Sequence, residues 1–165
     1  MKSALEVALT ILSRRALTRS ELENRLVIKG FSEKEIDAAI IRLSDWGYLN
    51  DKSLGLSYCT VRKKVSSRGK IKRELINRGL DIDLANEVIH QVYSDLEEHE
   101  QCDKLGNKLW LEECKRWDRI YQHKDNYQRL SREVVLRHKV ASKLNQRGYS
   151  IDLIRKVLDK IQGKD

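Results

Sequence analysis

Apolar residues recur in three aligned copies of one pattern, and each copy is centred on a glycine. The copies run from Glu21 to Leu43, Lys70 to Val92 and Lys139 to Ile161, with Gly30, Gly79 and Gly148 as fixed points. In every copy apolar side chains stand eight and four residues before the glycine, and six, ten and thirteen residues after it. Steps of three and four indicate amphipathic helices, so the pattern predicts an internal helical repeat.

The residues around each glycine predict a turn between two helices. Each glycine follows Lys or Arg and precedes an apolar residue, which is typical of a helix that ends in a left-handed cap. Ser32, Asp81 and Ser150 lie two residues beyond the glycines and are good N-caps for the next helix. Capping boxes are predicted for Ser3 with Glu6, Thr18 with Glu21 and Ser32 with Glu35.

Extending the pattern predicts three helices per repeat. The first repeat has helices over about 3–15, 19–29 and 33–45, and Gly47 ends the third, with Asn50 or Asp51 capping the next. A fourth helix has a core stripe that leaves its basic residues outward. The stripe is Leu54, Tyr58, Val61 and Val65, and the outward residues are Thr60, Lys63, Lys64 and Ser67.

The later helices follow the same logic. Gly69 breaks the fourth helix, the fifth reaches about Arg78, and the sixth runs from about Ile82 into an acidic segment. The third repeat has a longer helix over about 103–123, a turn near Asp125-Asn126 and a basic helix that ends at Arg147. We therefore predict an all-α fold of three tandem three-helix repeats at 1–51, 52–103 and 104–165.

Composition agrees with a helical, intracellular protein. There is no proline, there are eight glycines, and 35% of the 165 residues are charged, which favours surface helices over sheet turns. No apolar stretch reaches membrane length and no signal peptide is evident, so we expect a cytoplasmic protein that makes no membrane contact. Three cysteines at unrelated spacings suit reduced thiols.

The net charge of +8 is distributed in bands along the chain. Residues 59–79 carry eight basic side chains and one acidic, residues 81–103 carry eight acidic side chains and no Lys or Arg, and residues 129–147 carry six basic and one acidic. Oppositely charged helices of neighbouring repeats facing one another would explain the bands. Basic bands that contact a polyanion would explain them equally well.

Known catalytic and metal-binding patterns are not found. The chain has no glycine-rich phosphate loop, and His99, Cys102, Cys114 and His123 match no zinc-site spacing. We expect no enzyme, no cofactor and no metal. The tryptophans, Trp46, Trp110 and Trp117, fit core positions, and the pairs Glu97-Glu98 and Glu112-Glu113 fit solvated helix faces.

Paired helices also raise the possibility of a helix-turn-helix DNA reader. Such a reader places a basic recognition helix after the turn. Here the helices after the glycines carry apolar stripes, and the one from Ile82 to Leu96 is strongly acidic. This disfavours sequence-specific reading of the major groove but leaves contact with backbone phosphates open.

Three motifs resemble the RecX regulatory proteins over nearly the whole chain. They are Gly47-Tyr48-Leu49-Asn50-Asp51, the run Gly69-x-Ile71-x-x-Glu74-Leu75-x-x-x-Gly79, and Lys139-x-x-x-x-Leu144-x-x-Arg147-Gly148-Tyr149-Ser150-x-x-x-Ile154. The resemblance implies tandem three-helix repeats in an elongated, curved array. It also implies a monomeric regulator that binds the RecA filament on single-stranded DNA and inhibits its extension, ATP hydrolysis and strand exchange, and so modulates recombination, DNA repair and the SOS response.

The basic bands supply the candidate contacts for such a filament. The first set is Lys63, Lys64, Arg68, Lys70, Lys72 and Arg73, and the second is Arg132, Arg137, Lys139 and Lys143. We also expect weak, non-specific and salt-dependent binding to single-stranded DNA. Two alternatives stay open: a stand-alone DNA-binding repressor, which would prefer a defined duplex, and a structural helical scaffold, which would bind neither DNA nor filament.

Overall fold

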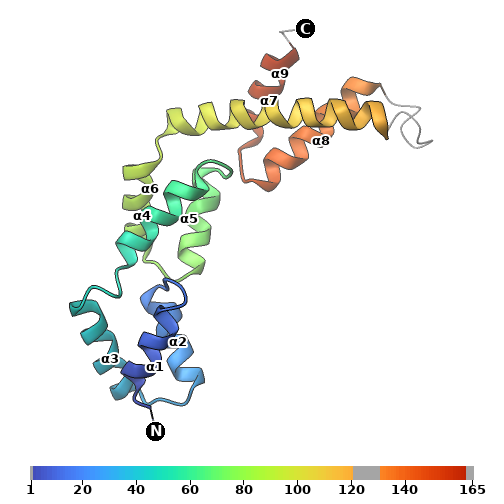
Figure 1. The fold of residues 1–165 in the computed structure, drawn as a ribbon. Coiled ribbons are helices and arrows are strands. Elements are labelled where there is room, and N and C mark those ends of the chain that lie inside the picture. The colour runs from blue at the N-terminus through green and yellow to red at the C-terminus, as the bar shows by residue number, and fades with distance from the viewer. Residues whose placement is uncertain (1, 121–130, 163–165) are drawn as a thin grey trace. The chain divides into compact units, whose positions relative to one another are not determined.

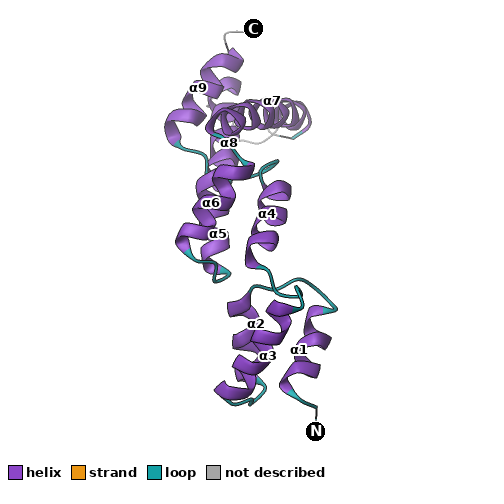
Figure 2. Ribbon diagram, turned by 90° about the vertical axis from the view of Figure 1, so that its left-hand side faces the viewer, coloured by secondary structure: helices purple, strands orange, loops and turns teal. Residues whose placement is uncertain are grey.

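The chain forms only helices over the residues that the computed structural model describes, 2–120 and 131–162 (Figures 1 and 2). The helices are α1 (Ala4–Leu12), α2 (Arg19–Ile28), α3 (Glu33–Asp45), α4 (Asp51–Arg62), α5 (Arg68–Asn77), α6 (Ile82–Val92), α7 (Asp95–Arg119), α8 (Arg132–Gln146) and α9 (Ile151–Gln162). The all-α prediction is confirmed. None of these helices is both long and apolar enough to cross a membrane.

The repeated apolar positions form the core. All residues that stand eight and four before the glycines are fully buried, and so are most of those that follow them; Val92 alone among the fifteen positions is half-buried. The repeat inferred from spacing is therefore a repeat of buried side chains.

The predicted turns and caps are present. Gly30, Gly79 and Gly148 have φ values of 86°, 91° and 84°, in the left-handed region that favours glycine. Ser3 and Thr18 accept hydrogen bonds in capping boxes with Glu6 and Glu21. These local interactions define where the helices begin and end, so sequence alone located most helix boundaries to within a few residues.

The described chain divides into two compact units. Unit 1 comprises residues 1–61 and 72–92, and unit 2 comprises residues 62–71 and 93–165, so the division falls within α5. The proposed division into three repeats at residues 51 and 103 stays a prediction.

Unit 1 contains the core of the first repeat. Helices α1, α2 and α3 pack against one another around Leu22, Leu26 and Ile40, each fully buried. In the same unit α4 approaches α6 closely at Gly55, where an added Cβ would lie 3.1 Å from Leu80 and 3.2 Å from Val88. Gly55 thus permits this helix pair to form.

Unit 2 is built on the long helix α7, which packs against α8 and α9. Its core includes Leu109, Leu144 and Val157. A Cβ at Gly106 would lie 2.5 Å from Val157, so a glycine is required where α9 crosses α7. The predicted turn at Asp125-Asn126 and the end of the predicted 103–123 helix fall outside the described residues.

Three details of the helix assignment were wrong. The sixth helix ends at Val92 and does not continue along the acidic segment, because Ser94 caps a new helix and forms a capping box with Glu97. Consequently α7 starts at Asp95, not near residue 103. Gly69 lies inside α5, and the break after α4 falls at residues 63–67.

The predicted stripe on the fourth helix was also wrong at its C-terminal end. Val61 and Val65 are 67% and 40% exposed, whereas Ser67, expected to face outward, is buried. Gly55 and Cys59 are the buried residues of α4. Val61 lies inside α4 but two residues from buried Cys59, so it faces away from the buried side. Val65 and Ser67 lie beyond Arg62, where α4 has ended and the helical period no longer applies.

Two further burial predictions need correction. Trp46 is 55% exposed and packs edge to face with exposed Tyr48, because it occupies the C-cap position of α3 outside the apolar stripe. Glu113 is fully buried in unit 2, where its carboxylate pairs with Lys143 at 2.5 Å and Arg116 at 3.6 Å. An acidic side chain with two cationic partners can occupy a helix face that sequence assigns to solvent.

The turn glycines of the second and third copies dock onto the first turn of a helix in the copy before. In unit 1, a Cβ at Gly79 would lie 2.6 Å from Ser20 Oγ, and the Thr18 hydroxyl donates a 2.6 Å hydrogen bond to the Arg78 carbonyl. In unit 2, a Cβ at Gly148 would lie 2.7 Å from both Ser67 Oγ and Lys70 Cβ.

The second of these contacts repeats the register of the first. The backbone N–H of Ser67 donates a 3.0 Å hydrogen bond to the Arg147 carbonyl. Thr18 and Ser67 both stand twelve residues before the glycine of their own copy. We call this repeated contact the turn joint. Around Gly30, by contrast, an added Cβ would meet nothing within 4 Å.

An ion pair reinforces the turn joint in unit 1. Arg78 donates through Nε and Nη2 to the two carboxylate oxygens of Glu21, both at 3.0 Å, and its guanidinium lies 5.4 Å from the centre of the Tyr58 ring. Burial raises the pKa of Glu21, but hydrogen bonds from the Arg78 side chain and the Thr18 backbone outweigh it and lower that pKa below 4.5. The glutamate of the α2 capping box thus also binds the next copy.

Replacing the turn glycines with alanine tests the joint. Gly30→Ala should cost about 1 kcal/mol, the strain of a side chain in the left-handed region. Gly79→Ala and Gly148→Ala carry the same strain and a steric clash, and should cost about 1–3 kcal/mol more. Denaturant unfolding measures the three losses in the free energy of unfolding. Equal losses for all three variants would contradict the close contacts of Gly79 and Gly148.

The lowered pKa of Glu21 predicts a pH-dependent stability. Stability from this carboxylate is fully present above its unfolded pKa near 4.5 and is lost as the pH falls through the lower folded pKa. Arg78→Met should reduce the free energy of unfolding at neutral pH by about 1–3 kcal/mol and make its decline below about pH 5 shallower.

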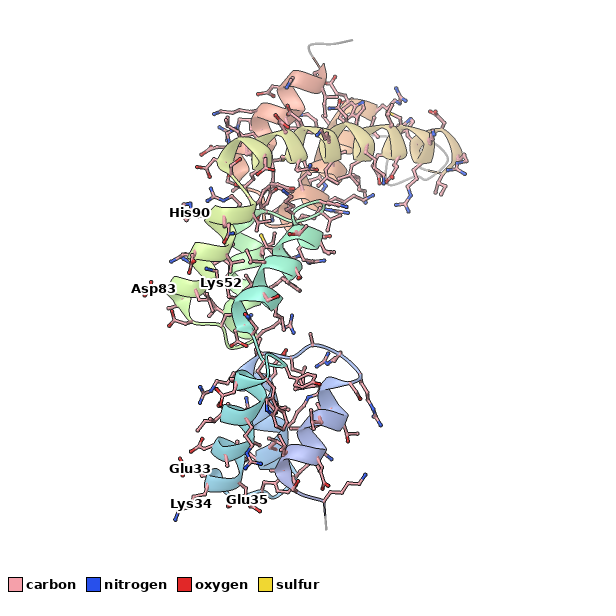
Figure 3. All side chains as sticks on the ribbon, turned by 60° about the vertical axis from the view of Figure 1, so that its left-hand side comes forward. Glu33, Lys34, Glu35, Lys52, Asp83 and His90 are labelled. Carbon is pink, nitrogen blue, oxygen red and sulfur yellow. The ribbon has the colours of Figure 1, made fainter. Side chains whose placement is uncertain are left out.

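Lys52 of α4, labelled in Figure 3, provides the control for that substitution. It pairs with Glu87 of α6 at 2.6 Å, but both side chains are about half exposed. Lys52→Met should therefore cost less than about 1 kcal/mol at neutral pH. The free energy of unfolding is measured against pH for wild type and Arg78→Met. If the two decline in parallel from neutral to acid pH, the Glu21 pair is excluded as a source of stability.

Candidate nucleic-acid interface

The first predicted set of cations follows α4 and continues along α5. Lys63 and Lys64 lie in the connection after α4, and Arg68, Lys70, Lys72 and Arg73 lie in α5. The first four belong to unit 2 and the last two to unit 1. The structure thus distributes this set over both units.

Acidic residues of α7 neutralise part of the set. Lys63 Nζ lies 3.0 Å from Glu97 Oε1. The Arg68 side chain forms an ion pair with Asp95, and its backbone N–H donates a 2.8 Å hydrogen bond to Glu98. The bands thus pair for these two cations, but Lys63 lies outside a helix and both acidic partners fall within the same predicted repeat, 52–103, rather than in a neighbouring one.

The acidic residues that pair with these cations also stabilise their own helix, α7. Asp95, Glu97 and Glu98 occupy the first turn of α7, where negative charge is stabilised by the helix dipole. Hydrogen bonds from the Ser94 backbone and from Lys63 lower the pKa of Glu97. The acidic band thus both caps α7 and pairs with the basic band.

Lys70 has a structural role in the turn joint of unit 2. Its Nζ donates a 2.7 Å hydrogen bond to the carbonyl of Gln146, two residues before Gly148. The side chain is half-buried. Its ammonium group is therefore committed to the end of α8.

Lys64, Lys72 and Arg73 are not neutralised by acidic side chains of the described residues. Within the described parts of the chain, none of the three forms an ion pair with a carboxylate. Lys64 and Arg73 are exposed, and Lys72 is half-buried. These three are the strongest candidates of the first set for contacting phosphates.

The second predicted set is mostly paired within unit 2. Arg132 lies 3.7 Å from Asp118, Arg137 lies 2.7 Å from Asp159, and Lys143 pairs with buried Glu113. Lys139 is half-buried. This set contributes first to the packing of α7, α8 and α9. Arg129, at the start of the basic band, lies outside the described residues.

Another concentration of cations, not singled out from sequence, lies in unit 1. A groove of about 630 Å³ is lined by α1 and the C-terminal half of α2. Its charged lining residues are Lys2, Arg14, Arg15, Arg25 and Lys29. Arg14 and Arg15 are adjacent in sequence, and Arg25 and Lys29 are four apart, a spacing that places them on one helix face. The spacing of Arg25 and Lys29 was therefore the sequence signal that could have identified this groove.

No group of three or more His, Cys, Asp or Glu residues that could hold a metal occurs in the described residues. Cys59 in unit 1 and Cys102 in unit 2 are fully buried. Burial, with the nearby Asp103 and Glu98 carboxylates, raises the pKa of Cys102 to about 12. His123 lies outside the described residues.

The helices, turns and buried positions define a protein of tandem helix-turn-helix repeats with a basic surface. Comparison with known proteins identifies the family more closely. Residues 4–43 match the family model described as "RecX, first three-helix domain". A crystal structure of RecX from Lactobacillus salivarius superposes with a TM-score of 0.70 at 25% identity, over 96% of this chain and 94% of that one.

Relatives named "Regulatory protein RecX" match over 65% to 98% of the chain. The protein of Legionella pneumophila (strain Corby) is 29% identical over 98% of this chain and 97% of its own length. The Bacillus subtilis protein is 28% identical over 98% of this chain, and the Caldanaerobacter subterraneus protein is 31% identical over 65%. The chain spans about half the length of these last two, 56% and 55%. The chain belongs to the RecX family.

Neutralising single cations tests which of them contact phosphates. Lys64→Gln and Arg73→Gln should each reduce the slope of log affinity for single-stranded DNA against log salt by about 0.7. Lys63→Gln should change the slope less, because Glu97 already pairs with Lys63. Titration of labelled oligo-dT at several salt concentrations measures the slopes. The assignment fails if the first two variants keep the wild-type slope.

Proposed function

We propose that the chain is a non-catalytic, cytoplasmic regulator that binds the RecA filament on single-stranded DNA as a monomer. It inhibits filament extension, ATP hydrolysis and strand exchange, and thereby modulates recombination, DNA repair and the SOS response. The observation that carries the proposal is the match of 98% of the chain to a relative of nearly equal length named "Regulatory protein RecX".

The charge distribution supports contact with a nucleoprotein surface. Lys64, Lys72 and Arg73, which form no ion pair among the described residues, suit phosphates, while exposed acidic side chains of α6, such as Asp83, suit basic protein surface. A partner that combines DNA and protein offers both. A free duplex offers only the first, and α6, the helix after the second turn, carries no Lys or Arg with which to read it.

The decisive experiment is RecA-catalysed ATP hydrolysis on single-stranded DNA with fewer than one copy of the protein per RecA. Strong inhibition is expected, because one bound regulator that halts filament extension affects many subunits. Competition for DNA would require enough protein to cover it. Hydrolysis at the uninhibited rate, with the protein demonstrably helical, would refute the proposal.

A parallel measurement separates this function from a repressor. Binding to a set of defined duplexes should vary little with sequence. A specific repressor would prefer its site by about 10³-fold or more over random duplex. A preference of that size, with no effect on RecA, would assign the chain to transcription instead.

A further inference from the structure

The groove between α1 and α2 in unit 1 is lined by both cationic and aliphatic side chains. Its uncharged lining residues are Val7, Thr10, Ile11 and Ile28. Val7 and Ile11 are half-buried, and Ile28 is 83% exposed, the highest value for a large apolar side chain in the described residues. Ile28 thus adds exposed apolar surface to the lining of the groove.

The charge of the groove has one sign. None of its lining residues is acidic, and none of its five cations forms an ion pair with a carboxylate in the described residues. Only Arg15 has a described effect on an acid, contributing to the lowered pKa of Glu21. Arg25 and Lys29 also complement the C-terminal end of α2. That role explains neither Lys2 nor Arg14, which lie next to α1.

The lining also argues against a nucleic-acid strand as the occupant. Proteins that hold single strands stack bases on aromatic side chains, and the groove has none. Phosphate contacts alone would leave the aliphatic lining residues without a partner. A peptide with carboxylates and aliphatic side chains uses both features.

The turn joint shows that the basic residue before a turn glycine can bind a carboxylate in the first turn of another helix. In the second copy, Arg78, the residue before the turn glycine, binds Glu21 in the capped first turn of a helix. Lys29 is the equivalent residue of the first copy, and it lines the groove without such a partner in the described chain. Gly30 beside it is likewise uncovered.

We infer that the α1–α2 groove docks an acidic amphipathic helix of a partner protein. Carboxylates of its first turns bind Arg25, Lys29 and their neighbours, and an aliphatic side chain contacts Ile11 and Ile28. This inference goes beyond the proposed function, because it concerns a surface in unit 1 that includes none of the predicted filament-binding residues.

A synthetic probe tests the site on the full chain. The probe is a fluorescein-labelled helical peptide that starts Ser-x-x-Glu, carries leucines at helical spacing and is otherwise acidic. Fluorescence anisotropy should detect binding that weakens with salt. A peptide of equal charge with serines in place of leucines should bind at least about tenfold more weakly, because it cannot bury the aliphatic lining residues.

Matched variants locate the binding. Arg25→Glu should weaken the leucine peptide by about tenfold or more, and Ile28→Ser by about fivefold or more. The control is Lys34→Glu, which makes the same charge change in the first turn of α3, outside the groove (Figure 3). It should change binding by less than about twofold. Arg25, Ile28 and Lys34 are exposed, so all three variants should fold.

Several results would overturn the inference. They are equal binding of the leucine and serine peptides, no binding of either, binding unaffected by Arg25→Glu, and oligo-dT binding that Arg25→Glu abolishes while the peptide fails to bind. Self-association lost in Arg25→Glu would assign the groove to a second copy. If Arg25→Glu misfolds, peptide-induced chemical shifts of wild-type Val7, Ile11 and Ile28 decide instead. RecA ATP hydrolysis is a separate readout, so failure here and failure of the proposed function are distinguishable.

Discussion

The close approach of a turn glycine to the first turn of an earlier helix is the contact on which the repeat depends. Gly79 against Ser20 in unit 1 and Gly148 against Ser67 and Lys70 in unit 2 leave no room for a side chain. The same glycines adopt a backbone conformation that other residues disfavour. Glycine therefore both adopts the left-handed conformation and permits the close contact. Hydrogen bonds to the carbonyls of Arg78 and Arg147 hold each contact in register.

Sequence predicted the features that depend on neighbours along the chain. Apolar spacing identified the buried positions, glycines identified the turns, and Thr18 with Glu21 identified a capping box, because each is an interaction within a few residues. It missed the start of α7 although Ser94 and Glu97 formed the same capping signal. The acidic run around that signal was interpreted as one continuous helix.

The candidate site was harder to predict because charge partners are distant in sequence. Whether Lys63 is available depends on Glu97, thirty-four residues away, and Lys143 depends on Glu113, thirty residues away. A count of basic residues treats Lys63 and Lys64 alike, although the fold pairs the first with Glu97 and leaves the second exposed. The groove in unit 1 was missed because its cations are spread from Lys2 to Lys29, in and around two helices, and no single basic band contains them.

Burial of Cys59 and Cys102 gives the chain a built-in reporter of local opening. The thiolate is the form that reacts with thiol reagents, and Cys102, with its pKa raised to about 12, remains a protonated thiol in the folded unit 2. Cys59 is equally shielded from reagent in unit 1. The labelling rate of each of these two thiols therefore follows the opening equilibrium of its own unit, so Cys59 and Cys102, unlike half-buried Cys114, report two local stabilities.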